Sequence, residues 1–140
     1  MSDPAADLEM VKESLAAALP MRHVQRGMVD PANAQRTQLL DGLVCLVADG
    51  GGDFANYYGR EGEMGRMKVV AVGFVLVGEN TPAQAVEDAE LALLKELLAW
   101  MNQPSVVQPG WAVLPQSWRC SQQLEHPYGW VVLEMDVRLT

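Results

Sequence analysis

The first apolar pattern along the chain has the spacing of a helix. Ser2 or Asp3 is suited to cap this helix, and Pro4 suits its first turn. Pro20 is expected to end it, because proline cannot continue a helix. The apolar stripe that predicts the helix consists of Leu8, Val11, Leu15, Ala18 and Leu19.

A second apolar stripe predicts a longer helix from about Pro82 to Met101. Thr81 precedes Pro82, which places a capping residue and a first-turn proline where helices favour them. The stripe consists of Val86, Ala89, Leu93, Leu97 and Trp100, widened by Leu94, Leu98 and Met101. The charged residues expected mostly outside it are Glu87, Glu90, Lys95 and Glu96.

Two runs dense in β-branched residues, Leu43 to Val47 and Lys68 to Val77, predict neighbouring strands. The segment between them is rich in glycine, so we expect a β-hairpin with an unusually long tip. The second run is apolar at both odd and even positions, which implies that both faces of that strand are covered. In a chain with few helices, another subunit is a candidate cover for one of these faces.

The C-terminal residues alternate cleanly from Trp130 to Leu139, which predicts a strand with one buried face. Ser117 to Gln122 is a candidate strand beside it, and His126 to Gly129 (HPYG) predicts a turn. The apolar side of the C-terminal strand carries Val131, Leu133, Met135, Val137 and Leu139, and the other side carries Glu134, Asp136 and Arg138.

The remaining stretches carry weaker signals. Arg22 to Met28 is compatible with an edge strand, and the DPANAQRTQ that follows is typical of a turn-rich connection. Gln103 to Pro115 holds three prolines and one glycine, which predict an irregular segment with at most one short extended piece. The order of elements predicts one α+β domain over residues 1–140, with a mostly antiparallel sheet and two helices packed on one face.

The hairpin tip, at about residues 49–66, has an unusual composition. The stretch ADGGGDFANYYGREGEMGRM (48–67) holds six glycines, three aromatic residues and six charged residues, and we expect it to be flexible. Aromatic side chains with arginines nearby often anchor protein interfaces. One alternative is that an aromatic side chain folds back onto the domain itself. The candidate partner-contact residues are Phe54, Tyr57, Tyr58, Arg60 and Arg66.

The composition favours a globular protein. Of the 140 residues, 49% are hydrophobic and 20% are charged, and the formal net charge of −8 argues against direct nucleic-acid binding. That expectation would change only if assembly gathered Arg60, Arg66 and Lys68 on one surface. No apolar run is long enough for a membrane helix, and the acidic start is unlike a secretory signal, so we expect synthesis in the cytoplasm.

The glycines of the tip do not predict a nucleotide site or any other cofactor. They are followed by aromatic residues and a strand rather than by the helix that a phosphate-binding loop needs. Cys45 and Cys120, with only His23 and His126 to add, lack the spacing of a zinc site. We therefore expect free, buried or half-buried thiols and no metal.

No constellation of residues predicts an enzyme. Cys120, Glu125 and His126 lie close in sequence, but a structural cysteine and a turn histidine explain them better than a nucleophile and its base. Glu134 and Asp136 share a strand face, where a solvated surface or a subunit contact is commoner than a catalytic pair.

In its order of elements, the chain resembles the tail terminator family of long-tailed bacteriophages, the minor tail protein U group. The likeness lies in an N-terminal helix, a hairpin with a long tip, a second helix and a C-terminal strand (YGWVVLEMDVRLT). It extends over nearly the whole chain as a pattern of elements, and no signature motif carries it. The tip is richer in glycine and aromatic residues than the family requires.

The resemblance implies a structural protein rather than an enzyme. Proteins of this family form a homohexameric ring on the last ring of the tail tube, stop tube polymerisation and present the surface that joins the head. The implied partners are further copies of the chain, the tail tube protein and the head-completion protein, and the implied location is the virion tail of a phage or prophage.

Three alternatives stay open from the sequence, and one of them is a host interaction module such as a regulatory subunit. Another head–tail joining or neck protein has a similar size and order of elements. A small cytoplasmic α+β enzyme or ligand-binding domain would use the hairpin tip as a mobile lid. Such a lid should close over convergent polar groups, and the sequence does not bring such groups together.

Overall fold

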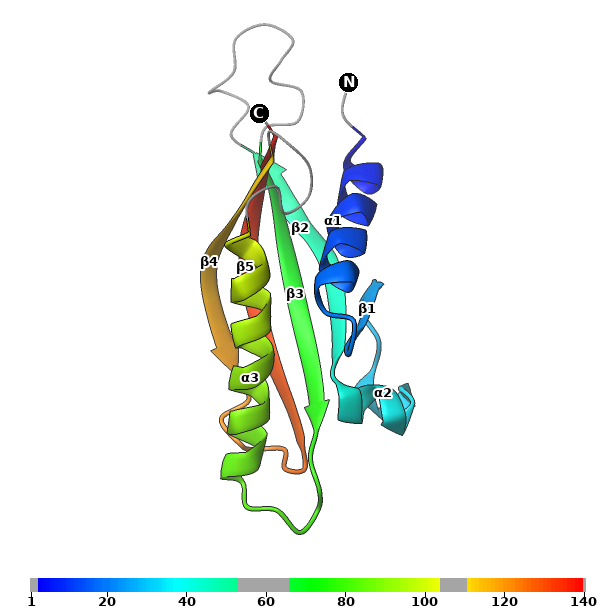
Figure 1. Cartoon of the computed structure of the whole chain (residues 1–140), viewed down its shortest axis with the longest axis vertical. Helices are drawn as coiled ribbons and strands as arrows, with labels where there is room; N and C mark the ends of the chain where they lie inside the picture. The colour runs from blue at the N-terminus through cyan, green and yellow to red at the C-terminus, as the bar shows by residue number, and fades with distance from the viewer. Residues whose placement is uncertain (1–2, 53–65, 104–110, 140) are drawn as a thin grey trace, which may run out of the picture.

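The computed structural model describes residues 3–52, 66–103 and 111–139 (Figure 1). Apart from the short helical segments before the hairpin, the elements follow the predicted order: a helix, an edge strand, a hairpin, a second long helix and two C-terminal strands. In chain order the elements are α1 (Pro4–Ala18), β1 (His23–Arg26), the 3-10 helix η1 (Pro31–Asn33), α2 (Arg36–Asp41), β2 (Leu43–Gly52), β3 (Arg66–Leu76), α3 (Gln84–Met101), β4 (Trp111–Cys120) and β5 (Tyr128–Leu139).

The five strands form one sheet in the order β1-β2-β3-β5-β4. All neighbouring strands are antiparallel except β1 and β2, which are parallel. The predicted α+β fold with a mostly antiparallel sheet is therefore confirmed, as is the hairpin of β2 and β3. The pairing of β4 with β5 is also confirmed, and β4 forms one edge of the sheet (Figure 1).

Two strand boundaries differ from the prediction. β4 begins at Trp111, inside the stretch expected to be irregular, because Pro115 lies on an edge strand and the register shifts between Pro115 and Ser117. An edge strand with a bulge tolerates a proline that a central strand would not. β5 begins at Tyr128, two residues earlier than the predicted strand and inside the stretch predicted to be a turn.

The hairpin strands extend further into the predicted loop than its composition indicates. β2 continues to Gly52 and β3 begins at Arg66, so the ends of the segment expected to be a loop at 49–66 are strand. The register shifts between Ala48 and Gly51, and Gly50 takes a φ of 97°. A glycine adopts this conformation without steric cost, so a bulge carries the ladder past Asp49 and Gly50. Residues 53–65 lie outside the described part of the chain.

The two predicted helices, α1 and α3, lie side by side on one face of the sheet (Figure 1). Their buried residues pack on one side of the strands, and Trp100 is the largest fully buried side chain. α3 begins two residues later than predicted, and the Thr81 hydroxyl donates to the Gly78 carbonyl rather than capping the helix. The strand residues of this core are Val44, Leu46, Met67, Val69, Ala71, Val75, Val113, Val131, Leu133, Met135 and Val137.

The opposite face of the sheet, here called the back face, is covered at one end by a segment that the sequence did not predict to be helical. η1 and α2 lie where the sequence predicted a turn-rich connection, and Leu39 of α2 packs against Phe74 of β3. The chain itself therefore covers part of the strand face for which another subunit was the candidate cover. Val70 and Val72, further along β3 on the same face, remain only half-buried. α2 was missed because six residues are too few for a helical pattern to stand out.

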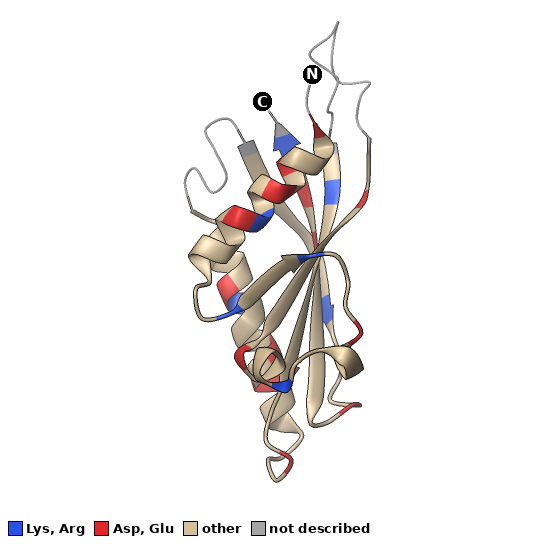
Figure 2. Ribbon diagram, turned by 90° about the vertical axis from the view of Figure 1, so that its right-hand side faces the viewer, with Lys and Arg blue, Asp and Glu red and all other residues tan. Residues whose placement is uncertain are grey.

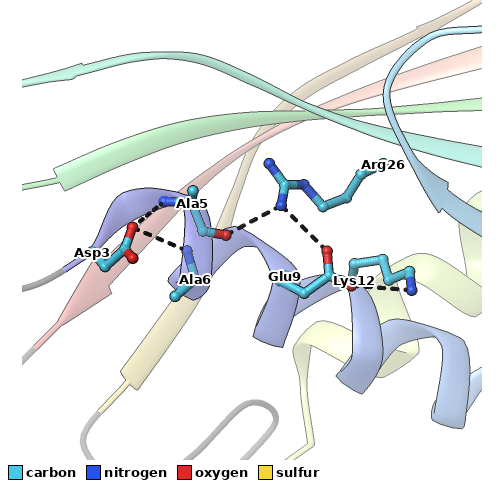
Figure 3. A network of polar contacts seen from close by, with 6 residues as sticks. All are labelled: Asp3, Ala5, Ala6, Glu9, Lys12 and Arg26. Atoms are coloured by element: carbon cyan, nitrogen blue, oxygen red, sulfur yellow. Dashed lines mark hydrogen bonds and ion pairs between the residues drawn. The ribbon is translucent and has the colours of Figure 1, made fainter.

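The N-terminus of α1 is fixed to the sheet by a small polar network (Figure 3). Asp3 caps the helix, because its Oδ1 accepts hydrogen bonds from two first-turn amides. Arg26 at the end of β1 donates to the Ala5 carbonyl at 3.3 Å and to Glu9 Oε2 at 3.2 Å. The hydrogen bond from Arg26, followed by that from Lys12, lowers the pKa of the Glu9 carboxyl. Asp3 is one of the two capping residues that the sequence offered.

Gly73 allows α3 to lie close to the centre of the sheet. A Cβ atom at this position would lie 2.4 Å from Leu93 Cδ2 and 3.2 Å from Val131 Cγ1, and both of those residues are fully buried. A side chain at this position would therefore push the helix and the strands apart.

We predict that Gly73→Ala lowers the free energy of unfolding by about 2 kcal/mol, because overpacking a filled core carries a cost of that size. Gly78→Ala is the matched control, since its nearest contact is 3.4 Å away, and its effect should stay within about 0.5 kcal/mol. Urea denaturation measures both. Equal losses of unfolding free energy for the two substitutions would show that α3 does not pack closely against the sheet at Gly73.

Candidate interaction surface

The structure describes only one of the five predicted partner-contact residues. Phe54, Tyr57, Tyr58 and Arg60 lie outside the described residues. Arg66 is the first residue of β3, and its backbone pairs in register with Gly52 on one side and Arg138 on the other. The prediction that these five residues contact a partner therefore stays a prediction.

The described residues form an apolar groove on the back face, with a volume of about 370 Å³. Its floor comes from the sheet, where Phe74 of β3 lies opposite Trp130 of β5 in register. Leu39 of α2 closes one side of the groove, and Tyr128, with 41% of its surface exposed, lies at another side. The lining residues are Asp30, Pro31, Ala32, Leu39, Phe74, Val75, Glu125, Tyr128, Gly129 and Trp130.

The sequence of β5 contains one signal for this groove. Tyr128, Trp130 and Val132 fall on the same strand parity as Glu134 and Asp136, the side predicted to be charged. Three apolar residues on a face predicted to be polar indicate that this half of the face is covered or binds something. The other contributors, from η1 and α2, could not be placed without the fold.

The groove has an acidic rim. Asp30 and Glu125 line it, and its lining includes no lysine or arginine. Asp30 is partly engaged, since its Oδ1 accepts a hydrogen bond of 3.0 Å from the Ala32 amide at the start of η1. The Glu125 carboxylate forms no hydrogen bond or ion pair with any other described residue. It is therefore available to a positively charged partner.

A second exposed apolar feature lies along β4, whose outer side has no neighbouring strand in the described chain. Trp118 is 49% exposed and Leu114 is 42% exposed. Arg119 is also exposed, but it lies opposite Val132 on the back face, whereas Trp118 lies opposite Leu133 on the helix side of the sheet. Leu114, opposite Asp136, shares the back face with Arg119, so the two exposed apolar side chains of β4 lie on different faces of the sheet.

The other half of the back face is polar. A depression of about 430 Å³ is lined by side chains that include Lys68, Ser117 and Glu134, and Ser117 Oγ donates to Glu134 Oε2 at 2.9 Å. Asp136 lies on the side of β5 that was predicted to be charged. Only 2% of its surface is exposed, so its carboxylate is not solvated as on an ordinary surface. Gln116, the extra residue at the bulge of β4, covers it and donates to its carboxylate at 3.0 Å.

Glu90 anchors the floor of the groove from the helix side of the sheet. The sequence placed this residue with the charges outside the apolar stripe of α3, but it is fully buried. Its Oε2 accepts hydrogen bonds from the Trp130 amide at 2.7 Å and from the amide and hydroxyl of Ser121. Gly129 makes room for it, because a Cβ there would lie 2.6 Å from Glu90 Oε2. The prediction that Glu90 lies outside the buried stripe was wrong. Helical periodicity alone assigns this residue to solvent, but the donors of Ser121 and Trp130 bind its carboxylate inside the protein.

The two cysteines are free, as predicted, with Cys45 buried and Cys120 half-buried. Burial raises the pKa of the Cys45 thiol. His126 Nε2 lies 3.3 Å from Thr81 Oγ1 and so is engaged by the loop before α3. Cys120 is held in β4 opposite Val131, on the helix side of the sheet.

The charged positions of the described chain are spread out. Figure 2 shows acidic positions on helices, strands and loops, with the few basic positions apart from one another. Among the described residues, no group of three His, Cys, Asp or Glu side chains could hold a metal ion. In the same part of the chain, no helix is long and apolar enough to cross a membrane.

Compared with known proteins, the chain matches no protein-family model and no curated protein sequence.

We predict that Glu90→Ala lowers the free energy of unfolding by about 3 kcal/mol, because it leaves buried donors of Ser121 and Trp130 without an acceptor. Glu90→Gln keeps one acceptor oxygen and should cost about half as much. The control is Glu87→Ala, one turn earlier, which removes a half-buried hydrogen bond to Gln123 and should cost under about 1 kcal/mol. Urea denaturation measures the free energy of unfolding of the three variants. A Glu90→Ala protein as stable as the Glu87→Ala protein would contradict the anchoring role.

Proposed function

We propose that this chain is a structural assembly protein of a phage or prophage tail. In this proposal it forms a homo-oligomeric ring, hexameric as in the tail terminator family that it resembles. The ring caps the tail tube, ends its polymerisation and provides the surface that joins the head. Its partners are other copies of itself, the tail tube protein and a head-completion protein, and its place is the virion tail.

The observation that carries the proposal is the uneven cover of the sheet. One face is closed by α1 and α3, whereas the back face is closed only near α2 and keeps the groove open. Apolar sheet surface is normally buried against another layer. A subunit contact would bury the rest of this face, and Tyr128, which is exposed on it, is of a residue type enriched in interfaces.

The order of elements also supports the proposal. The described chain has the long hairpin, the flanking helices and the C-terminal strand on which the resemblance rests. Another neck protein with the same order of elements remains the alternative within virion assembly. The groove favours one function of a different class, because its volume and aromatic lining also suit a small apolar ligand.

The proposal is tested by adding the purified protein to tail tube protein that is polymerising. We predict that tubes stop growing and carry a ring at one end, seen by negative-stain electron microscopy. The ring should contain about six chains of 15.3 kDa each. Gly78→Ala, which leaves the fold and the exposed surfaces unchanged, should cap tubes as well as the unaltered protein.

Tubes that keep growing at saturating protein, with no ring at either end, would contradict the proposal. Stoichiometric binding of a small apolar compound in the groove, together with a strictly monomeric state, would favour the ligand-binding alternative.

A further inference from the structure

The groove on the back face combines an aromatic floor with carboxylates at its rim. Phe74 and Trp130 lie opposite each other in register, and Tyr128 lies two residues before Trp130 on the same side of β5. Among the described residues that line the groove, the charged ones are Asp30 and Glu125. We propose that the groove binds an arginine side chain that is carried between apolar residues on a partner protein other than this chain.

This inference deepens the proposed function, on which it rests. It states the chemistry by which the tail tube protein or the head-completion protein is recognised. It does not use β4 or the polar depression of the back face, which stay available for contacts between copies.

The aromatic floor favours a guanidinium group over other cations. A cation is attracted to the face of an aromatic ring, most strongly to that of tryptophan, and the planar group of arginine also stacks on such a ring. Trp130 is half-buried, and its amide donates to Glu90 Oε2 at 2.7 Å, so the backbone of the floor is held before a partner arrives. A lysine ammonium is more strongly hydrated and does not stack in this way.

The carboxylates of the rim are attached to fixed points of the backbone. The Glu125 carbonyl accepts a hydrogen bond of 2.8 Å from the Tyr128 amide, and the Pro127 carbonyl accepts one of 3.0 Å from the Val77 amide at the end of β3. The Glu125 carboxylate forms no hydrogen bond or ion pair within the described chain. Asp30 uses only its Oδ1, which caps η1, within the same part of the chain. An arginine above the floor would therefore gain charge-assisted hydrogen bonds, which are stronger than neutral ones.

The charge of the chain favours a different protein over a second copy as the occupant. A second copy would bring the same formal net charge of −8 to a groove that is itself acidic, whereas a basic partner is attracted to it. Three arginines of the described chain already pair with carboxylates of the same chain, namely Arg22, Arg26 and Arg138.

The openness of the groove favours a side chain presented by a protein over a free small molecule. Asp30, Glu125 and Tyr128 are all exposed at its rim. Sites for small molecules bury most of the surface of their ligand. An open groove of about 370 Å³ instead leaves room for the apolar residues on either side of the arginine.

The test titrates a short capped peptide, with arginine between two leucines, into protein labelled with ¹⁵N. The matched probe carries citrulline, which has nearly the shape of arginine but no charge. We expect the arginine peptide to shift the amide signals of Ala32, Tyr128 and Trp130 and to bind at least about tenfold more tightly than the citrulline peptide. A lysine peptide should bind about threefold more weakly than the arginine peptide.

Three variants separate the rim from the floor. Glu125→Gln should weaken binding of the arginine peptide about fivefold and leave the citrulline peptide unaffected. Tyr128→Leu keeps an apolar side chain but removes the ring, and should weaken the arginine peptide about threefold. Glu13→Gln, the matched control, removes the same charge from an exposed position of α1 on the other side of the sheet and should change neither affinity. Circular dichroism checks that all three fold.

Four results would overturn the proposal. Arginine and citrulline peptides could bind equally well, or Glu125→Gln could behave like Glu13→Gln. A lysine peptide that binds as tightly as the arginine peptide would show a general cation site. Ethylguanidinium that binds as tightly as the arginine peptide would show a site for a free small cation.

The assembly assay separates a foreign partner from another copy. Glu125→Arg places a cation at the rim, so it should still form rings in solution but fail to attach them to the tube or to the head. Loss of the rings themselves, in this variant or on addition of the arginine peptide, would show that the groove receives a second copy and would overturn the proposal.

Failure of this inference is distinguishable from failure of the proposed function. If the unaltered protein caps tubes but does not prefer the arginine peptide, the ring stands and this site is wrong. If the protein prefers the arginine peptide but neither forms rings nor caps tubes, the groove stands as an arginine site and the proposed function falls.

Discussion

The placement of α3 on the sheet depends on a buried carboxylate and two glycines. Glu90 reaches from the helix to the Trp130 amide and the Ser121 turn, while Gly73 and Gly129 leave the space that this close approach needs. Because the Trp130 amide is held from the helix side, the residue opposite Phe74 is fixed where it forms the groove floor. A carboxyl group inside the core is costly unless it is hydrogen-bonded, and here three donors converge on Oε2, while Oε1 has no hydrogen-bond partner among the described residues.

The consequence is a sheet with two unequal faces. α1 and α3 build the main core on one face, and a smaller cluster around Leu39 and Phe74 covers only part of the other. The remaining back face combines a groove with an acidic rim and a polar depression that contains the nearly buried Asp136. Together with the exposed Trp118, these features are suited to binding a protein partner, and they are the physical basis for proposing an assembly role.

The long-range pattern of the fold could be predicted from the sequence because apolar periodicity is strong in α1, α3 and β5, and because the β3 segment is a dense run of β-branched residues. The short elements η1 and α2 could not, since six residues or fewer carry little periodic signal. Glu90 was misplaced because its partners lie 31 and 40 residues away, in a turn and strand whose position only the fold reveals. The groove combines residues from four separate stretches, so only the aromatic residues on the charged parity of β5 pointed to it. The aromatic tip at 53–65, which the sequence favoured as the contact segment, lies outside the described residues, and the described surfaces now offer a second place for contact.

The central claim is that assembly covers the open back face and the free edge of the sheet. Hydrogen–deuterium exchange, measured on dilute monomer and on the assembled protein, tests it most directly. We expect slower exchange on assembly in β4 and in the groove segments at 30–32 and 124–130, with little change in α1. Unchanged exchange in β4 and in these segments, with new protection confined to α1 or to the outer side of α3, would contradict it.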